Sequence, residues 1–280
     1  MARHRQHLRV RSYGGPGPSV VVLHGGPGAP GSAGPLARAL ADPLHTLEPW
    51  QRWSSSVPLT VDQHVKDLAC VVSQHAPGEK PALVGESWGA MLALAFASRH
   101  PDRVSALVLI GCGTFDRRAR ARLQQTLEQR TTPELEARLA DLEAQVPIEA
   151  ERAAKMHGLS DPIYTYRRAT DADDLVEPFD LKGHVESWND MVRLQDSGEY
   201  PAGFTAIRCP VVMLHGVYDP HPGAMIRDSL KTYIPHLEYQ EFDECGHTPW
   251  VEELARDRFL AAARGWLAQP GRLPGGASEV

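Results

Sequence analysis

Five consecutive residues near the middle of the chain have the spacing of a catalytic nucleophile. Gly85-Glu86-Ser87-Trp88-Gly89 reads G-x-S-x-G, with the apolar run PALVG leading into it and an apolar helical pattern following it. Between a strand and a helix, this motif places its serine on a sharp, strained turn that small flanking residues allow to close. The hydroxyl then lies at a helix N-terminus, whose dipole favours developing negative charge. The motif therefore predicts Ser87 as a nucleophile.

A serine hydroxyl attacks a carbonyl carbon only when a base takes its proton and an acid orients that base. On a strand–helix scaffold, the acid and then the histidine follow the serine along the chain. Asp219 comes in the loop after the apolar run PVVMLHG, and His247 comes in the loop after LEYQEF. Each could be an ordinary loop residue by itself. Because the loops at the carboxyl ends of parallel strands meet at one edge of a sheet, the two residues and Ser87 together predict a Ser-His-Asp triad.

The glycine-rich loop HGGPGAPG allows two interpretations. It contains the spacing G-x-G-x-x-G, with Glu48 further along, as in loops that bind dinucleotides. Pro27 and Pro30 argue against that function, because each lacks an N–H that a pyrophosphate would need. Acyl transfer instead requires two N–H groups that stabilise an oxyanion. We expect these donors to be the backbone N–H groups of Gly26 and Trp88.

Seven short runs have the character of strands, and most are apolar throughout. They are HLRVRS, SVVVLHG, LHTLEPW, PALVGE, VSALVLIG, CPVVMLHG and LEYQEF. Continuous apolar runs are typical of parallel strands that are covered on both faces. Helical patterns occupy residues 60–72, 87–100 and about 250–267. The sequence therefore predicts an α/β fold with a mostly parallel sheet.

The character of the chain changes at about Phe115. The segments RRARARLQQTLEQR and TPELEARLADLEAQV are charged amphipathic helical patterns, and no strand pattern returns before CPVVMLHG. We therefore expect a helical insertion at residues 114–205, inside an α/β core formed by residues 1–113 and 206–280.

Composition limits the possible partners. The 280 residues carry a formal net charge of −6, which argues against a nucleic-acid partner. The longest apolar run, residues 91–97, is too short to cross a bilayer, so no membrane association is expected. The basic start of the chain has no apolar segment after it, as a secretory signal would have. Together with four scattered cysteines, this favours a cytoplasmic protein with reduced thiols.

No metal or organic cofactor is expected. The four cysteines share no spacing typical of metal ligands. His215, His221 and His247 lie in one C-terminal region, but their spacing matches no zinc site.

With these motifs, the chain resembles the α/β-hydrolase family over nearly its whole length, and within it the proline iminopeptidases. HGGPG is similar to their oxyanion loop, and GESWGAMLALAFA is similar to their nucleophile segment, including Trp88. The resemblance implies the α/β-hydrolase fold, a mostly parallel sheet covered by helices on both faces, with an inserted helical cap. It also implies Ser87, Asp219 and His247 as the triad, with Gly26 and Trp88 as oxyanion donors.

One stretch departs from that family. The family carries D-x-R-G-x-G-R-S after the third expected strand, whereas this chain reads EPWQRWSSS and keeps only Arg52 and a serine. The cap also shows no recognisable copy of the glutamates that bind a substrate amino terminus in the family.

The leading hypothesis is a serine hydrolase that cleaves an amide or ester bond through an acyl-enzyme, as an aminopeptidase resembling proline iminopeptidase. A carboxylesterase, amidase or lactonase acting on a small molecule is the alternative. A non-catalytic ligand receptor on the same fold is an alternative of another class, but it would be expected to lack a triad member. Dehalogenase and epoxide hydrolase chemistry is disfavoured, because those enzymes use an aspartate where Ser87 stands.

An aminopeptidase must also hold the α-ammonium group of a short peptide against an anion. The segment TDADDLVEPFDLKGHVESWND is rich in acidic residues, most of which we expect to be solvated. Glu177 and Glu186 are the candidates for substrate binding, because Phe179 and Trp188 follow them closely and could form the wall of a pocket.

Overall fold

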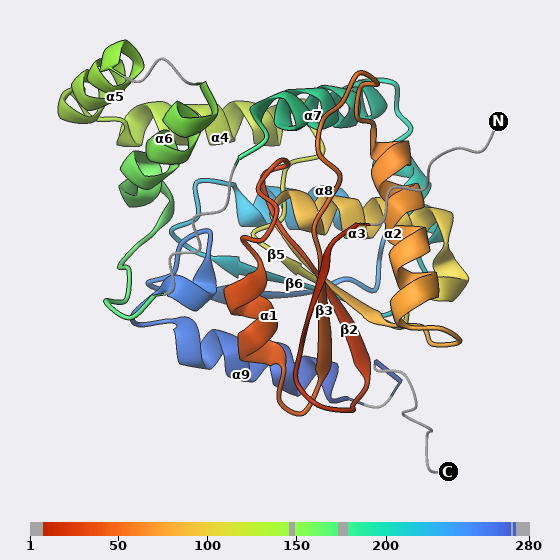
Figure 1. Cartoon of the computed structure of the whole chain (residues 1–280). Helices are drawn as coiled ribbons and strands as arrows, with labels where there is room; N and C mark the ends of the chain where they lie inside the picture. The colour runs from red at the N-terminus through yellow and green to blue at the C-terminus, as the bar shows by residue number, and fades with distance from the viewer. Residues whose placement is uncertain (1–7, 146–148, 173–178, 270, 273–280) are drawn as a thin grey trace.

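The computed structural model describes residues 8–145, 149–172, 179–269 and 271–272. A seven-stranded sheet with the order β1-β3-β2-β4-β5-β6-β7 forms its centre (Figure 1). The strands are β1 (Val10–Tyr13), β2 (Ser19–Leu23), β3 (His45–Pro49), β4 (Ala82–Glu86), β5 (Leu107–Ile110), β6 (Val211–Gly216) and β7 (Glu238–Phe242). Each strand overlaps a run that the sequence predicts as a strand. All neighbouring strands are parallel except β1 and β3, which are antiparallel.

Helices cover both faces of the sheet, as predicted. They are α1 (Gly34–Leu40), α2 (Val61–His75), α3 (Trp88–Arg99), α4 (Arg117–Arg130), α5 (Pro133–Gln145), α6 (Glu149–Tyr164), α7 (Leu181–Asp196), α8 (Gly223–Lys231) and α9 (Arg256–Leu267). Short 3-10 helices are η1 (Pro101–Arg103), η2 (Ala202–Ala206) and η3 (Pro249–Val251). Side chains alternate along β2, so Val21 packs in the cluster with α2, α3 and α8, and Val20 packs in the cluster with α1 and α9.

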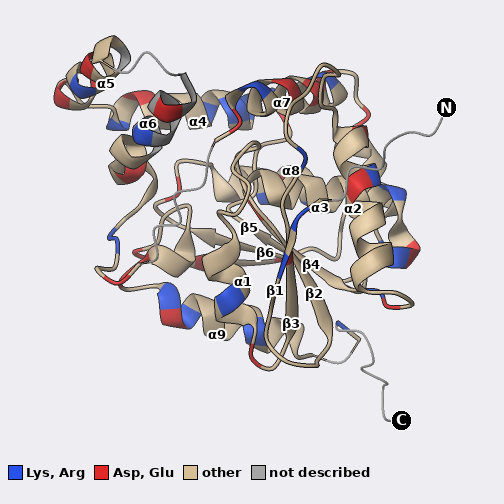
Figure 2. Ribbon diagram, viewed as in Figure 1, with Lys and Arg blue, Asp and Glu red and all other residues tan. Residues whose placement is uncertain are grey.

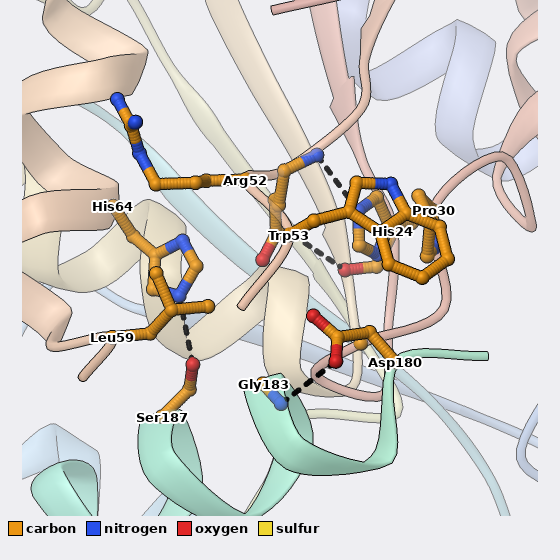
Figure 3. Close-up of a pocket in the computed structure, with 11 residues that line it drawn as sticks. His24, Pro30, Arg52, Trp53, Leu59, His64, Asp180, Gly183 and Ser187 are labelled. Carbon is orange, nitrogen blue, oxygen red and sulfur yellow. Dashed lines mark hydrogen bonds between the residues drawn. The ribbon is translucent and has the colours of Figure 1, made fainter. Parts of the chain in front are cut away.

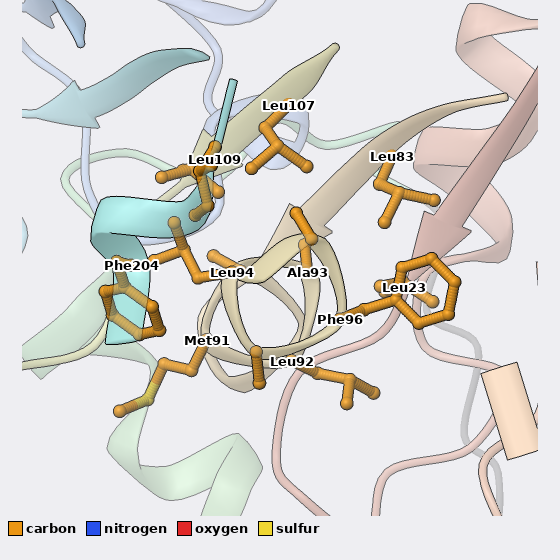
Figure 4. Close-up of a cluster of buried hydrophobic side chains, with 14 of the residues drawn as sticks. Leu23, Leu83, Met91, Leu92, Ala93, Leu94, Phe96, Leu107, Leu109 and Phe204 are labelled. Carbon is orange, nitrogen blue, oxygen red and sulfur yellow. The ribbon is translucent and has the colours of Figure 1, made fainter. Parts of the chain in front are cut away.

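Helix α3 lies at the middle of the larger core cluster, as its apolar sequence predicts. Figure 4 shows Met91, Leu94 and Phe96 pointing outward from α3 in different directions, and all three are fully buried or nearly so. Leu83 of β4 and Phe204 of η2 belong to the same cluster. A helix without a polar face is stable only when it is enclosed on all sides. This packing fixes the N-terminus of α3, where Ser87 lies.

Between β5 and β6 the chain forms α4, α5, α6 and α7, which lie along the top of the view in Figure 1. Asp116 caps α4 by accepting a hydrogen bond from Ala119 N (2.8 Å), and Asp180 caps α7 by accepting one from Gly183 N (3.0 Å). Such caps satisfy N–H groups that have no partner inside the helix. Helices α1, α6, α7 and α8 are not among those that the sequence predicts. The limits 114–205 for a separate cap stay a prediction.

Charged residues of both signs lie along the helices, whereas the strands at the centre carry few of them (Figure 2). Within the described residues, no helix is both long and apolar enough to span a bilayer. All four cysteines are free thiols, and Cys112, Cys209 and Cys245 are buried.

Candidate active site

Ser87 occupies a tight turn between β4 and α3. Its φ of 53° and ψ of −115° lie in a region that residues other than glycine rarely adopt, so the backbone is strained there. A Cβ atom on Gly85 would collide with the carbonyl of Gly89, and one on Gly89 would collide with the carbonyl of Leu23. The two glycines of G-x-S-x-G are therefore required for this turn. The hydroxyl of Ser87 makes no capping bond to α3 in the described structure, which leaves it available for chemistry.

Asp219 and His247 are brought together by the loops after β6 and β7. His247 Nδ1–H donates a hydrogen bond of 2.7 Å to Asp219 Oδ2. The backbone N–H of His247 donates to the carbonyl of Tyr164 at the end of α6 (2.8 Å). A Cβ atom on Gly111 would lie 2.9 Å from His247 Nδ1, so the glycine after β5 leaves room for the ring. These contacts fix both the position and the tautomer of the imidazole.

Two further histidines surround Asp219. Asp219 Oδ1 accepts two hydrogen bonds of 2.9 Å from His221, one from the backbone N–H and one from Nδ1–H. The His221 ring stacks on the His247 ring, with centroids 4.6 Å apart and an interplanar angle of 17°. His215 Nε2 lies 3.4 Å from Asp219 Oδ2 and donates to the carbonyl of His221 (3.0 Å). The three histidines that the sequence places in one region thus share one carboxylate.

Asp219, His221 and His247 also offer three possible metal ligands, whose donor atoms lie within 4.8 Å of one another. Imidazole and carboxylate groups suit zinc. In this arrangement, however, the Nδ1 atoms of His221 and His247 and both oxygens of Asp219 already take part in hydrogen bonds within the cluster. The hydrogen bonds account for the short separations without a metal ion.

Burial and charge set the protonation of this cluster. Burial alone would raise the pKa of Asp219, but the charges of His247, His221 and His215 hold that pKa well below its usual range. Burial lowers the pKa of His221, although the charge of Asp219 opposes this effect. Burial also opposes the charge on His247, but the charge and hydrogen bond of Asp219 and the charge of Glu86 outweigh it and raise the pKa of His247 to about 9.

Glu86 is a site residue that the sequence analysis missed. It ends β4 directly before Ser87, and its Oε1 lies 3.5 Å from His247 Nε2. Burial raises the pKa of this carboxyl group, and the charge of Asp219 adds to that effect. In the described residues no hydrogen bond joins Ser87 to His247, so Nε2 faces Glu86 instead. The signal in the sequence was an acidic residue at the end of an otherwise apolar strand, which the motif treats as a free position.

The loop expected to supply an oxyanion donor lies beside these residues. Gly26 is exposed and has a φ of 107°, which favours glycine. The side chain of His24 stabilises the loop. Its Nδ1–H donates to the carbonyl of Gly25 (2.8 Å), and its Nε2 accepts from Gln51 N (3.1 Å). Gln51 in turn accepts a bond from the indole of the buried Trp88 (2.7 Å). The backbone N–H of Trp88 lies in the first turn of α3, where N–H groups have no partner within the helix.

The acidic residues of α7 hold backbone groups of the core. Glu186 Oε2 accepts a hydrogen bond from Leu59 N (2.9 Å), and Asp190 accepts one from Val61 N (2.8 Å). Asp180 accepts a bond from the Ser54 hydroxyl (2.8 Å). The predicted role of Glu186 in substrate binding stays a prediction, and Glu177 lies outside the described residues.

The stretch that departs from the family pattern lines a small pocket beside the oxyanion loop (Figure 3). Arg52 and Trp53 line it together with His24 and Asp180. Helix α2 contributes His64, and α7 contributes Gly183 and Ser187. Ser87, Asp219 and His247 are not among the lining residues. Arg52 pairs with Asp67 of α2 at 2.6 Å. Glu48, the acidic residue of the dinucleotide alternative, is fully buried and pairs with Arg11 at 2.6 Å, so it is not free to hold a ribose.

The comparisons with known proteins agree with this architecture. The sequence profile of the alpha/beta hydrolase fold matches residues 18–254, so the chain belongs to the α/β-hydrolase family and is a hydrolase of that fold.

Individual relatives are distant. The chain is similar to a proline iminopeptidase of Lactobacillus helveticus, with 23% identity over 291 residues that cover 90% of each protein. Among solved structures, it is similar to a thermophilic esterase from Thermogutta terrifontis, with a TM-score of 0.62 and 21% identity over 93% of this chain and 92% of that one. It is also similar to VinJ, with a TM-score of 0.66 and 20% identity over 95% of this chain and 96% of that one.

Proposed function

We propose that this protein is a serine hydrolase that cleaves an amide or ester bond through an acyl-enzyme. Ser87 is the nucleophile, His247 the general base and Asp219 the acid that orients the base. The observation that carries the proposal is the 2.7 Å hydrogen bond from His247 to a buried carboxylate, at the end of the sheet where Ser87 occupies its strained turn. That pairing holds the His247 tautomer whose Nε2 can accept a proton.

The reaction follows from these positions. Ser87 Oγ attacks the substrate carbonyl carbon while its proton passes to His247 Nε2. The backbone N–H groups of Gly26 and Trp88 donate to the oxyanion that forms. His247 then gives the proton to the leaving amine or alcohol, and an ester remains on Ser87. Water, activated by His247, hydrolyses that ester and restores the serine.

The segment 114–205 is proposed as a cap that limits access to this site. Two contacts support the proposal. Tyr164 of the segment accepts the backbone N–H of His247, and Asp180 N donates to the carbonyl of Gly28 in the oxyanion loop (2.8 Å). The segment therefore contacts both sides of the space where a substrate carbonyl must lie.

Within this class, an aminopeptidase similar to the proline iminopeptidases is the finer proposal. The distant relatives of that name, which align over 90% of the chain, and the HGGPG loop support it. A small-molecule esterase, amidase or lactonase is the alternative. The scattered, free cysteines support a cytoplasmic location.

A parallel assay of the full chain tests the proposed function. The panel contains chromogenic aminoacyl amides, a prolyl amide among them, and acyl esters of short and long chains. We expect turnover of at least one class, and we expect Ser87→Ala to abolish it while the circular dichroism spectrum stays unchanged. If the folded protein turned over neither class, or if Ser87→Ala kept full activity, the proposal would be wrong and a receptor function would gain support.

A further inference from the structure

Glu86 lies at the centre of the proposed site without a role in the proposed mechanism. It directly precedes Ser87, and a Cβ atom on Gly25 would collide with its carboxylate, so the carboxylate lies against the oxyanion loop. On its other side, Oε1 is 3.5 Å from His247 Nε2. The Glu86 side chain is 12% exposed and that of His247 is 11% exposed, so both are similarly sheltered from water.

A sheltered carboxylate needs a cationic partner or a proton. Among the described residues, His247 is the group that forms an ion pair with Glu86. The remaining titratable groups around His247 supply no second cation. The pKa of Asp219 is held low, which favours the anion, burial lowers the pKa of His221, which disfavours its cation, and the Tyr164 ring lies 5.6 Å away by centroid. His215 lies on the Asp219 side of the cluster.

The pairing of Glu86 with His247 conflicts with catalysis. His247 can pair with Glu86 only while it carries a proton on Nε2, and a general base must first lose that proton. Once His247 is neutral, the Glu86 carboxylate has no cation near it among the described residues. A substrate that brings its own cation would remove this conflict.

We propose that Glu86 binds an ammonium group of the substrate, close to the scissile carbonyl, and so selects substrates with a free amine. The inference rests on the proposed function, because it takes Ser87 as the reacting atom. The substrate ammonium replaces protonated His247 as the partner of Glu86. His247 loses its proton to solvent, and its Nε2 is then free to accept the proton of Ser87.

The acidic residues of α7 are poorer candidates, because none of them adjoins Ser87 in sequence or pairs with His247 as Glu86 does. Glu186 accepts a backbone N–H from Leu59 and Asp180 accepts a bond from Ser54, as described above. Glu86 is the acidic residue that directly precedes the nucleophile. Asp190→Asn is therefore a matched control, because it neutralises an acid that holds the backbone N–H of Val61 rather than one beside Ser87.

The test compares Glu86→Gln, Asp190→Asn and the unaltered protein on paired substrates. Each pair is an aminoacyl ester or amide with a free amine and its N-acetyl counterpart, assayed at pH 7. We expect Glu86→Gln to lower kcat/KM for the free amine at least about tenfold relative to the N-acetyl compound. Asp190→Asn should keep the ratio of the unaltered protein.

The pH profile supplies a second measurement that a merely structural role would not change. Loss of the Glu86 charge lowers the pKa of His247, so for a neutral acyl ester the acidic limb of kcat/KM should move to lower pH in Glu86→Gln. The inference would be overturned if the ratio of kcat/KM between the free-amine and N-acetyl substrates did not change. Equal losses on both substrates, with an unchanged acidic limb of the pH profile, would also overturn it.

Labelling of Ser87 by a fluorophosphonate separates the two proposals. If Ser87 is labelled but the ratio is unchanged, only the role of Glu86 is wrong. If Ser87 is not labelled in any variant, both proposals are wrong.

Discussion

Asp219 accepts hydrogen bonds at both carboxylate oxygens, from His247 at one and from His221 at the other. This arrangement prevents the carboxylate from rotating and holds the two imidazole rings in a stack. His221 lies two residues after Asp219, so the same short loop provides both the acid and the group that restrains it. In the proposed mechanism, His221 is therefore a positioning residue, which acts on the reaction only through Asp219 and His247.

Replacement of His221 tests that role. His221→Ala removes one hydrogen bond to a charged carboxylate, which is worth about 1.5–3 kcal/mol, so we expect kcat/KM to fall by about 10- to 100-fold. His221→Asn keeps a side-chain donor near Asp219 and should recover part of the loss. Steady-state kinetics on the best substrate of the panel measures both effects. If His221→Ala retained full activity, the side-chain hydrogen bond from His221 to Asp219 would be dispensable.

The protonation of His247 predicts the pH dependence of the unaltered protein. Its pKa is raised to about 9, and the reaction needs the neutral ring. Below that pKa the neutral fraction rises about tenfold per pH unit, so kcat/KM for an uncharged ester should rise with pH and level off near pH 9. A pH series with such an ester checks this. A plateau already reached at pH 7 would mean that Asp219 and Glu86 do not hold a proton on His247.

At the level of elements, α7 connects the proposed cap to the core through Asp180. The Asp180 carboxylate caps α7 and also accepts a hydrogen bond from the Ser54 hydroxyl. The backbone N–H of Asp180 donates to the carbonyl of Gly28. A Cβ atom on Gly28 would collide with the Asp180 carbonyl, so the oxyanion loop and α7 are in direct contact. The position of the loop therefore depends on a residue more than 120 positions away.

Asp180→Ala should lower the free energy of unfolding by about 2 kcal/mol or more, because the helix loses its cap and buried donors lose their acceptor. Asp196→Ala is the matched control at the other end of α7. Its exposed pairs with Arg117 and Arg120 should contribute little, because solvent screens them. Urea unfolding measures both values. Equal effects of the two substitutions would contradict the role assigned to Asp180.

The strands were predictable and several helices were not, for a physical reason. Strands enclosed on both faces need continuous apolar runs, and β2, β4, β5 and β6 show them directly. Helix α7 buries Gly183 and Ser187 beside Met191 and Leu194, so small and polar residues interrupt the apolar residues of its buried face. It is held by acidic side chains bonded to backbone groups far away in sequence, and no local pattern reports such bonds.

At the scale of the whole molecule, the order of the motifs along the chain was enough to predict that Asp219 and His247 belong to one site. The fold explains why the two residues lie together, since a parallel sheet places the loops after β4, β6 and β7 at one edge. Glu86, His215 and His221 could not be assigned in that way. Their contacts depend on the distances between side chains from separate loops, and sequence spacing does not carry that information.

The central claim is that Ser87 is a nucleophile activated by His247. Incubation of the folded protein with a fluorophosphonate probe at pH 8, followed by peptide mass spectrometry, tests it most directly. We predict a single adduct on Ser87, absent in Ser87→Ala and formed at least about 100-fold more slowly in His247→Ala. No adduct on the folded protein, or an adduct on another serine that persists in Ser87→Ala, would contradict the claim.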